Sequence, residues 1–205
     1  MISVYTAVED RLSATVLERL ISETNGAVEI GVPMPPKGSG ELKKKLPSLI
    51  KLAPNVPVIM LTDLDLKECA PSLASEWFGN RVKPKPLLFR VAVREVEAWL
   101  LADRTNFSEF ARVPLTKIPE SPEALDDPKQ TLLNLIARHS PSALKSDVIA
   151  DHGHGPEQGL SYNERLSQFV LHNWDPVQAS TQSDSLARAR KRIIELAEGG
   201  SQMHV

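Results

Sequence analysis

The sequence is poor in cysteine, in aromatic residues and in long apolar runs. Its 205 residues include one cysteine, Cys69, which excludes an intrachain disulfide and an all-cysteine zinc site. No apolar run reaches the roughly 18 residues of a membrane-spanning helix, and the N-terminus lacks the basic and apolar regions of a secretory signal. We therefore expect a soluble protein of the reducing cytoplasm without a membrane partner.

The chain also lacks an excess of charge of either sign. There are 24 Lys and Arg against 26 Asp and Glu, for a formal net charge of -2, and 41% of the residues are hydrophobic. This apolar content excludes a disordered chain. The balanced charge gives no general attraction to polyanions, which favours an adaptor or a small nucleotide substrate over a high-affinity duplex binder.

The first half of the chain alternates short apolar runs with helical patterns, which is typical of parallel strands joined by crossover helices. Strands are predicted at residues 2–8, 27–32, 56–61 and 87–93. The third run is the most apolar, so it predicts a central buried strand. The fold class predicted for residues 1–104 is α/β, a Rossmann-like parallel sheet of about four strands flanked by helices.

The second half changes character, because strand-like runs become scarce after residue 104. We expect residues 105–205 to form a mainly helical region packed on the sheet. Asp127 and Pro128 predict the start of one helix, as N-cap and first helical residue. Further helices are predicted at 161–171 and 183–196, with a loop over 151–156 before them.

Acidic residues follow three of the four predicted strands. Glu9 follows the first strand, Asp63 and Asp65 follow the third, and Glu95 and Glu97 follow the fourth. Ligands of an open parallel sheet bind outside the carboxyl ends of its strands. Carboxylates gathered there repel one another unless a cation lies among them, so the pattern predicts a site for Mg²⁺ or Mn²⁺.

Two consequences and one alternative follow from this acidic pattern. If Glu9 and Asp63 share an ion, their strands must be neighbours, which predicts the strand order 2-1-3-4. Asp-x-Asp spacing lets two carboxylates from one loop face the same ion. The alternative is a structural role, because acids such as Asp10 and Glu95 near helix starts stabilise the helix dipole.

Three segments carry a resemblance to a known family: Val8-Glu9, Thr62-Asp63-Leu64-Asp65, and the stretch Arg94-Glu-Val-Glu-Ala-Trp-Leu-Leu-Ala-Asp103. Together they resemble the Toprim-type domain of small bacterial proteins related to the nuclease domain of the OLD family. The resemblance implies that Glu9, Asp63 and Asp65 bind divalent cations for phosphodiester chemistry and that a later Glu completes the site. One departure is Asp10, where Toprim domains commonly have Gly.

The expected function is therefore a metal-dependent phosphodiester enzyme, a nuclease in defence or genome maintenance, with Glu95 or Glu97 as the outer catalytic acid. The resemblance also implies nucleic acid and an ATPase as partners, and the chain itself has no Walker phosphate-binding motif. Two alternatives stay open. One is a non-catalytic metal- or nucleotide-binding adaptor, and the other is a receiver-like phospho-switch, against which the chain shows no evident fifth strand with its Lys.

Basic clusters are the candidates for holding a phosphate substrate. Lys43 and Lys44 lie in a lysine run after Gly38-Ser39-Gly40 at a helix start, where backbone amides also bind phosphate. Arg188 and Arg192 are four residues apart and share a helical face, and Arg94 opens the stretch that carries the resemblance. The alternative for each cluster is a solvated helix surface.

Overall fold

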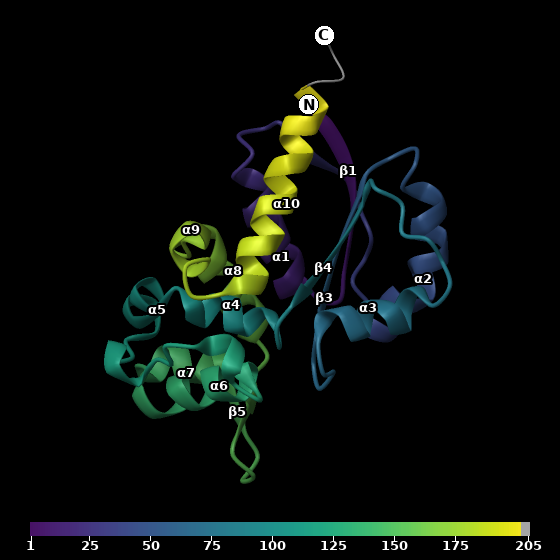
Figure 1. Ribbon diagram of the computed structural model, residues 1–205. Coiled ribbons are helices and arrows are strands. Elements are labelled where there is room, and N and C mark those ends of the chain that lie inside the picture. Colours follow the sequence, from purple (N-terminus) through teal and green to yellow (C-terminus); the bar gives the residue numbers. More distant parts are fainter. Residues whose placement is uncertain (202–205) are drawn as a thin grey trace. The chain divides into compact units, whose positions relative to one another are not determined.

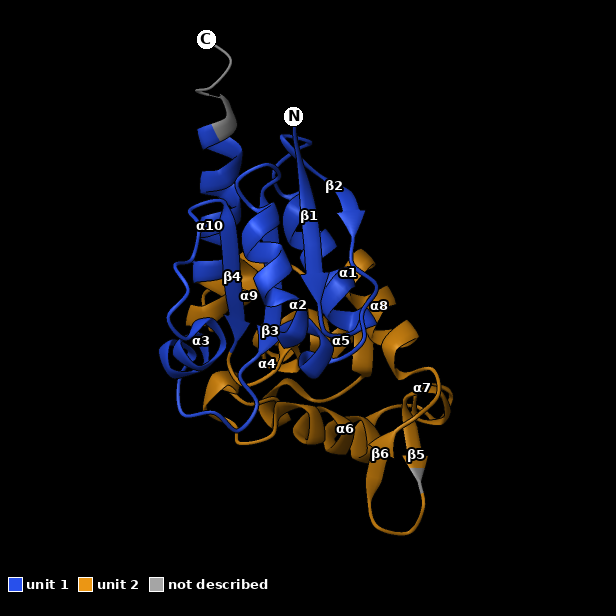
Figure 2. Cartoon of the chain, turned by 90° about the vertical axis from the view of Figure 1, so that its right-hand side faces the viewer, with its two compact units in different colours: residues 1–92, 188–205 blue, residues 93–187 orange. Residues whose placement is uncertain are grey.

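The computed structural model describes residues 1–201 and divides into two compact units. Unit 1 is Met1–Ala92 together with the chain from Arg188 onward, and unit 2 is Val93–Ala187 (Figure 2). The first boundary therefore falls at the end of the fourth strand, and the last helix returns to the unit that contains the sheet. Within the described residues, no helix is both long and apolar enough to cross a membrane.

Unit 1 is built on a four-stranded parallel sheet. Its strands are β1 (Ile2–Val8), β2 (Val28–Pro33), β3 (Val58–Asp63) and β4 (Leu87–Ala92), in the order β2-β1-β3-β4. This confirms the predicted fold class and the predicted strand order. The prediction of a central buried strand is also confirmed, because every residue from Val58 to Thr62 is at most 1% exposed.

Helices cover both faces of this sheet. Figure 1 shows α2 (Ser39–Leu52) and α3 (Ala70–Phe78) on one side, with α1 (Arg11–Ser22) and α10 (Asp184–Ser201) on the other. Apolar residues at helical spacing explain the packing, since α1 buries its stripe of Leu12, Val16, Leu17, Leu20 and Ile21.

An ion pair ties the last helix to the first. Arg190 of α10 donates from Nε and Nη2 to the two carboxylate oxygens of Glu23 after α1, at 2.9 and 2.8 Å. Both side chains are largely buried, with 15% and 13% of their surfaces exposed. A two-bond Arg–carboxylate pair fixes orientation as well as distance, so it sets how α10 lies on unit 1.

A proline lies inside the second helix of unit 1. The helix α2 continues from Ser39 to Leu52 with Pro47 inside it. Leu42, Leu46 and Leu49 recur on one face and are all buried. Burial of this stripe outweighs the backbone hydrogen bond that proline cannot donate.

Unit 2 is mainly helical, as predicted for the second half of the chain. Its elements are α4 (Val96–Ala102), α5 (Arg104–Ala111), the 3₁₀ turns η1 (Leu115–Lys117) and η2 (Pro122–Ala124), α6 (Pro128–His139), α7 (Ser142–Val148), β5 (Ile149–Asp151), β6 (Pro156–Gln158), α8 (Tyr162–His172) and α9 (Pro176–Ala179). The predicted N-cap is confirmed, because Asp127 accepts a hydrogen bond from the backbone N–H of Gln130 at 2.7 Å. The predicted loop over 151–156 is partly wrong, since β5 and β6 pair there as an antiparallel hairpin.

Candidate functional site

The carboxyl ends of β1 and β3 meet at one edge of the sheet. The two strands pair in register up to Val8 and Leu61, so the residues that follow them are neighbours. Glu9 reaches across to β3, where its Oε1 accepts hydrogen bonds from the backbone N–H of Asp63 at 3.0 Å and from the Thr62 hydroxyl. The first-strand acid and the Asp-x-Asp segment therefore lie together, as the sequence predicted.

Negative charge and burial act together on Glu9. Burial raises the pKa of the Glu9 carboxyl above its ordinary value, while the hydrogen bonds from Thr62 and Asp63 lower it. The charges of Asp65 and Asp10 raise the pKa further. We call the four acids Glu9, Asp10, Asp63 and Asp65 the acidic rim.

Asp10 also has a structural task within the acidic rim. Its side chain accepts a hydrogen bond from the backbone N–H of Ser13 at 2.7 Å and so caps the N-terminus of α1. This capping explains why an acid stands at position 10. Asp10 therefore has both expected roles of these acids: it caps a helix, and it adds negative charge beside Glu9.

In the segment that ends β3, a buried leucine lies between Asp63 and Asp65. Leu64 is 2% exposed, and its backbone N–H donates to the carbonyl of Ala92 at the end of β4, at 2.9 Å. Asp63 is half-buried at the strand end, whereas Asp65 is exposed and has a left-handed backbone with φ of 51°. Such a conformation costs free energy for a residue other than glycine, so the loop holds Asp65 in a constrained place.

The acidic rim suits a hard divalent ion by its donor chemistry. Among residues 1–201 no three Asp, Glu, His or Cys side chains are grouped so that they could hold an ion by themselves. Mg²⁺, however, is usually held by one or two carboxylates and completed by water and substrate phosphates. Glu9 and the Asp63-Leu64-Asp65 segment offer oxygen ligands of this kind, and the charge of Asp65 raises the pKa of the Glu9 carboxyl.

Glu97 belongs to unit 2 and is buried. It is 4% exposed, and its Oε1 accepts a hydrogen bond of 2.7 Å from the hydroxyl of Tyr162, which is 1% exposed. Burial raises the pKa of Glu97 to about 7, and the charge of Glu95 raises it too, while the Tyr162 hydrogen bond and Lys129 lower it. Lys129 Nζ lies 5.2 Å from the centre of the Tyr162 ring. No local pattern in the sequence points to Tyr162, because it is far from Glu97 along the chain.

Glu95 has a different role in the same unit. Its Oε2 accepts a hydrogen bond from the backbone N–H of Lys129 at 2.9 Å, in the first turn of α6. A carboxylate at that position satisfies an unpaired helical N–H and favours the positive end of the helix. Glu95 is thus a cap for a helix distant in sequence, and the outer-acid role expected for Glu95 or Glu97 stays a prediction.

The rest of the Arg94–Asp103 stretch builds the core of unit 2. All residues of α4 are buried. Trp99 donates from Nε1 to Ser185 at 2.7 Å, and its carbonyl accepts from Trp174 at 3.1 Å. Asp103 accepts from the backbone N–H groups of Asn106 at 3.3 Å and Asp175 at 2.7 Å. Packing and hydrogen bonding therefore account for much of the motif that resembles the Toprim-type family.

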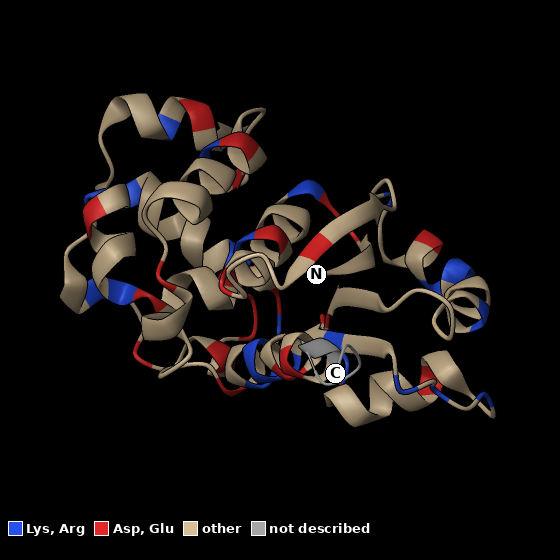
Figure 3. Ribbon diagram, turned by 90° about the horizontal axis from the view of Figure 1, so that it is seen from above, with Lys and Arg blue, Asp and Glu red and all other residues tan. Residues whose placement is uncertain are grey.

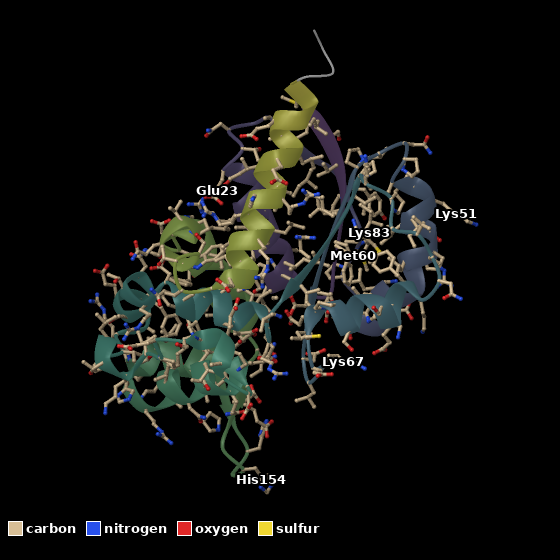
Figure 4. All side chains as sticks on the ribbon, viewed as in Figure 1. Glu23, Lys51, Met60, Lys67, Lys83 and His154 are labelled. Carbon is tan, nitrogen blue, oxygen red and sulfur yellow. The ribbon has the colours of Figure 1, made fainter. Side chains whose placement is uncertain are left out.

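The predicted substrate-binding residues are distributed over separate places. Lys43 forms an ion pair of 2.7 Å with Glu76, which also pairs with Lys67. Figure 4 labels Lys67 in the loop after β3. Those two lysines lower the pKa of Glu76 to about 2. Lys44 pairs with Glu41 at 2.6 Å. The lysine run is therefore partly neutralised by acids of α2 and α3.

The arginines lie elsewhere. Arg188 and Arg192 are exposed on α10, and Arg192 pairs with Glu195 on the same helix. Arg94 is half-buried in the short segment before α4 in unit 2. Figure 3 shows the basic positions of α2 and of α10 on different helices of unit 1. The lysine run and the α10 arginines therefore do not form one cluster.

No family model, curated protein or solved structure matches this chain. The resemblance to Toprim-type domains therefore rests on the three sequence segments alone. The sheet order and the meeting of Glu9 with Asp63 are the structural observations that accompany it.

Proposed function

We propose that the protein is a divalent-metal-dependent phosphodiester enzyme of the nuclease class, with its site at the acidic rim of unit 1. The observation that supports this most is the placement of Glu9, which lies against Asp63 where β1 and β3 end side by side. The charge of Asp65 raises the pKa of the Glu9 carboxyl there. A cation would relieve this repulsion and would connect the rim to a phosphate group. A cytoplasmic role in defence or genome maintenance beside a partner ATPase belongs to the same proposal through the family resemblance.

The residues at the acidic rim would have separate roles in binding the metal ion and in orienting Glu9. Glu9, Asp63 and Asp65 would hold Mg²⁺ or Mn²⁺, which supplies charge neutralisation at the phosphate and lowers the pKa of bound water. Thr62 and the Asp63 backbone fix the Glu9 carboxylate through its Oε1, so this side chain is oriented before any ligand arrives.

The test compares cleavage of labelled single-stranded and duplex DNA and RNA in Mn²⁺ and in EDTA. Asp63→Asn and Asp65→Asn keep the side-chain size but remove a ligand charge, so we expect loss of Mn²⁺-dependent cleavage by a factor of about 100 or more. Glu68→Gln is the matched control, because Glu68 is an exposed acid of the same loop. It should cleave like the wild type.

Metal binding separates the enzyme from the adaptor alternative. Water-proton relaxation in Mn²⁺ titrations should show binding to the wild type and weaker binding to Asp63→Asn. Binding without cleavage of any of the four substrates favours the adaptor, and no Mn²⁺ binding at millimolar concentration overturns the proposed site. Glu95→Gln and Glu97→Gln, measured in the same cleavage assay, decide whether either acid of unit 2 contributes to turnover.

A further inference from the structure

A second group of charged side chains in unit 1 lies away from the acidic rim. Phe89 of β4 packs against Trp77 and Phe78 of α3, at centroid distances of 5.5 and 5.4 Å. Successive residues of a strand point to opposite faces of the sheet. Arg90, the next residue, therefore points to the other face, which is the one that α1 and α10 cover (Figure 1).

Arg90 is unusual because part of its guanidinium has lost water without gaining an acceptor. Its Nε is buried, and no hydrogen-bond partner for that nitrogen exists among the residues that the structure describes. Buried side-chain nitrogens nearly always have a partner, and leaving one unsatisfied costs free energy. A shorter or apolar side chain would fit this position of the edge strand β4 equally well. The fold itself therefore does not require the free-energy cost of the unsatisfied nitrogen.

The surroundings of Arg90 are cationic. Burial lowers the pKa of the Arg90 guanidinium, and the charges of Arg192 and Arg188 lower it further, whereas Glu195 opposes them. Lys83, just before β4 (Figure 4), has its pKa lowered by burial and then by Arg90 and Arg192. The charges of Arg192 and Arg188 therefore act on Arg90, and the charges of Arg90 and Arg192 act on Lys83.

The acid whose charge opposes these cations at Arg90 is already shared. Glu195 forms ion pairs with Arg192 and, at 3.9 Å, with Lys191. Its single charge therefore cannot also balance Arg90 and Lys83. An anion with more than one negative charge would therefore compensate the group better than a carboxylate would, and planar guanidinium groups match the oxygens of phosphate.

We propose that Arg90, Lys83, Arg188 and Arg192 form a binding site for the phosphate group of a nucleotide or polynucleotide. Arg90 is the inner member, since its Nε is buried, while Arg188 and Arg192 are exposed on α10. This site goes beyond the function proposed above, because it needs no metal ion. It can be tested with all divalent ions removed, so its failure and the failure of the acidic rim are distinguishable.

The first experiment measures thermal unfolding in EDTA, with sodium phosphate or sodium chloride at equal ionic strength. Phosphate stabilises most proteins because it is excluded from their surface. The quantity that tests the site is therefore the surplus, the amount by which phosphate raises the melting temperature of the wild type more than that of Arg90→Met. At about ten times the dissociation constant, we expect a surplus of about 3–6 °C. Lys191→Met is the matched control, because Lys191 is an exposed cation of α10 that is not part of the proposed site. This variant should keep the full surplus.

The variant also checks its own folding. Because Arg90→Met removes an unsatisfied buried group, its melting temperature in chloride should equal or exceed that of the wild type. If Arg90→Met does not fold, Arg192→Gln at its exposed position provides the same comparison. No surplus for the wild type, or an equal rise in the wild type and in the folded variant, overturns the proposal.

A binding arm identifies the source of the phosphate. The anisotropy of a dye-labelled oligothymidylate is measured in EDTA with the wild type, Arg90→Met and Lys191→Met. A loss of roughly tenfold or more in Arg90→Met beyond any loss in Lys191→Met supports the site and assigns the phosphate to a polynucleotide. Equal oligothymidylate binding by all three proteins, together with a phosphate surplus in the melts, supports the site and assigns it to a small phosphorylated ligand.

Discussion

Replacing Glu97 by Gln should change how the stability of the protein depends on pH. Burial raises the pKa of Glu97 from its ordinary value of 4.5 to about 7. Below pH 4.5 the folded and unfolded chains both hold the proton. Between pH 4.5 and 7 the unfolded chain loses the proton while the folded chain keeps it, so the free energy of unfolding falls as the pH rises.

The size of this fall follows from the two pKa values. Each tenfold difference in proton affinity corresponds to about 1.4 kcal/mol, which gives a decrease of about 2.5 kcal/mol between pH 5 and pH 8. Glu97→Gln cannot titrate, so the difference in unfolding free energy between wild type and variant should decrease by this amount. For a chain of this length it corresponds to a change of about 5–10 °C in melting temperature.

Urea unfolding followed by tryptophan fluorescence measures the difference, since Trp99 and Trp174 both lie in unit 2. Any constant cost of burying the amide cancels when the two pH values are compared. Tyr162→Phe removes the hydrogen bond that lowers the pKa of Glu97, so the fall should extend to higher pH. Glu109→Gln, an exposed acid of unit 2, is the control. A wild-type–Glu97→Gln difference that stays constant within about 0.5 kcal/mol from pH 5 to pH 8 would refute the reasoning.

Two further predictions concern unit 1. Glu23→Gln removes the carboxylate charge that faces the largely buried Arg190, so urea unfolding should show a loss of about 3 kcal/mol, against little change for Glu18→Gln at an exposed position of α1. An equally small change in unfolding free energy for Glu23→Gln and Glu18→Gln would contradict this prediction, because it would mean that water solvates Arg190 as well as Glu23 does. Replacing Lys43, Lys44 and Lys45 together with Ala should weaken oligonucleotide binding and flatten its salt dependence, as measured by anisotropy at several salt concentrations. Unchanged binding would leave the lysine run as a solvated surface paired with Glu41 and Glu76.

Apolar runs were sufficient to predict the sheet, because β1, β3 and β4 are largely buried and flanked by helical patterns, although β2 buries only Val28. The predicted strand at 2–8 agrees with β1, and the others differ from β2, β3 and β4 by one or two residues. The order of the strands was predicted from chemistry rather than from periodicity. Acids at the ends of the first and third strands implied neighbouring strands, and Glu9 does lie against Asp63.

Interactions between distant residues were beyond the sequence. The hydrogen bond from Tyr162 to Glu97 and the cap that Glu95 provides for α6 join segments that share no local pattern. Arg90 was hidden inside an apolar run that predicts a strand and says nothing about neighbouring helices. The hairpin of β5 and β6 was missed because strands of three residues are too short to show an alternation.

The division of the chain has a consequence for its synthesis on the ribosome. Unit 1 begins with the first residue but is finished only when α10 supplies Arg190 and the apolar Ile193, after all of residues 93–187 have been translated. At about 5–20 residues per second, this interval lasts about 5–20 s. During that time the nascent sheet has α1 but not α10 on one of its faces (Figure 1). We therefore expect folding during synthesis to depend on the rate at which unit 2 is made, whereas refolding of the complete chain has no such interval.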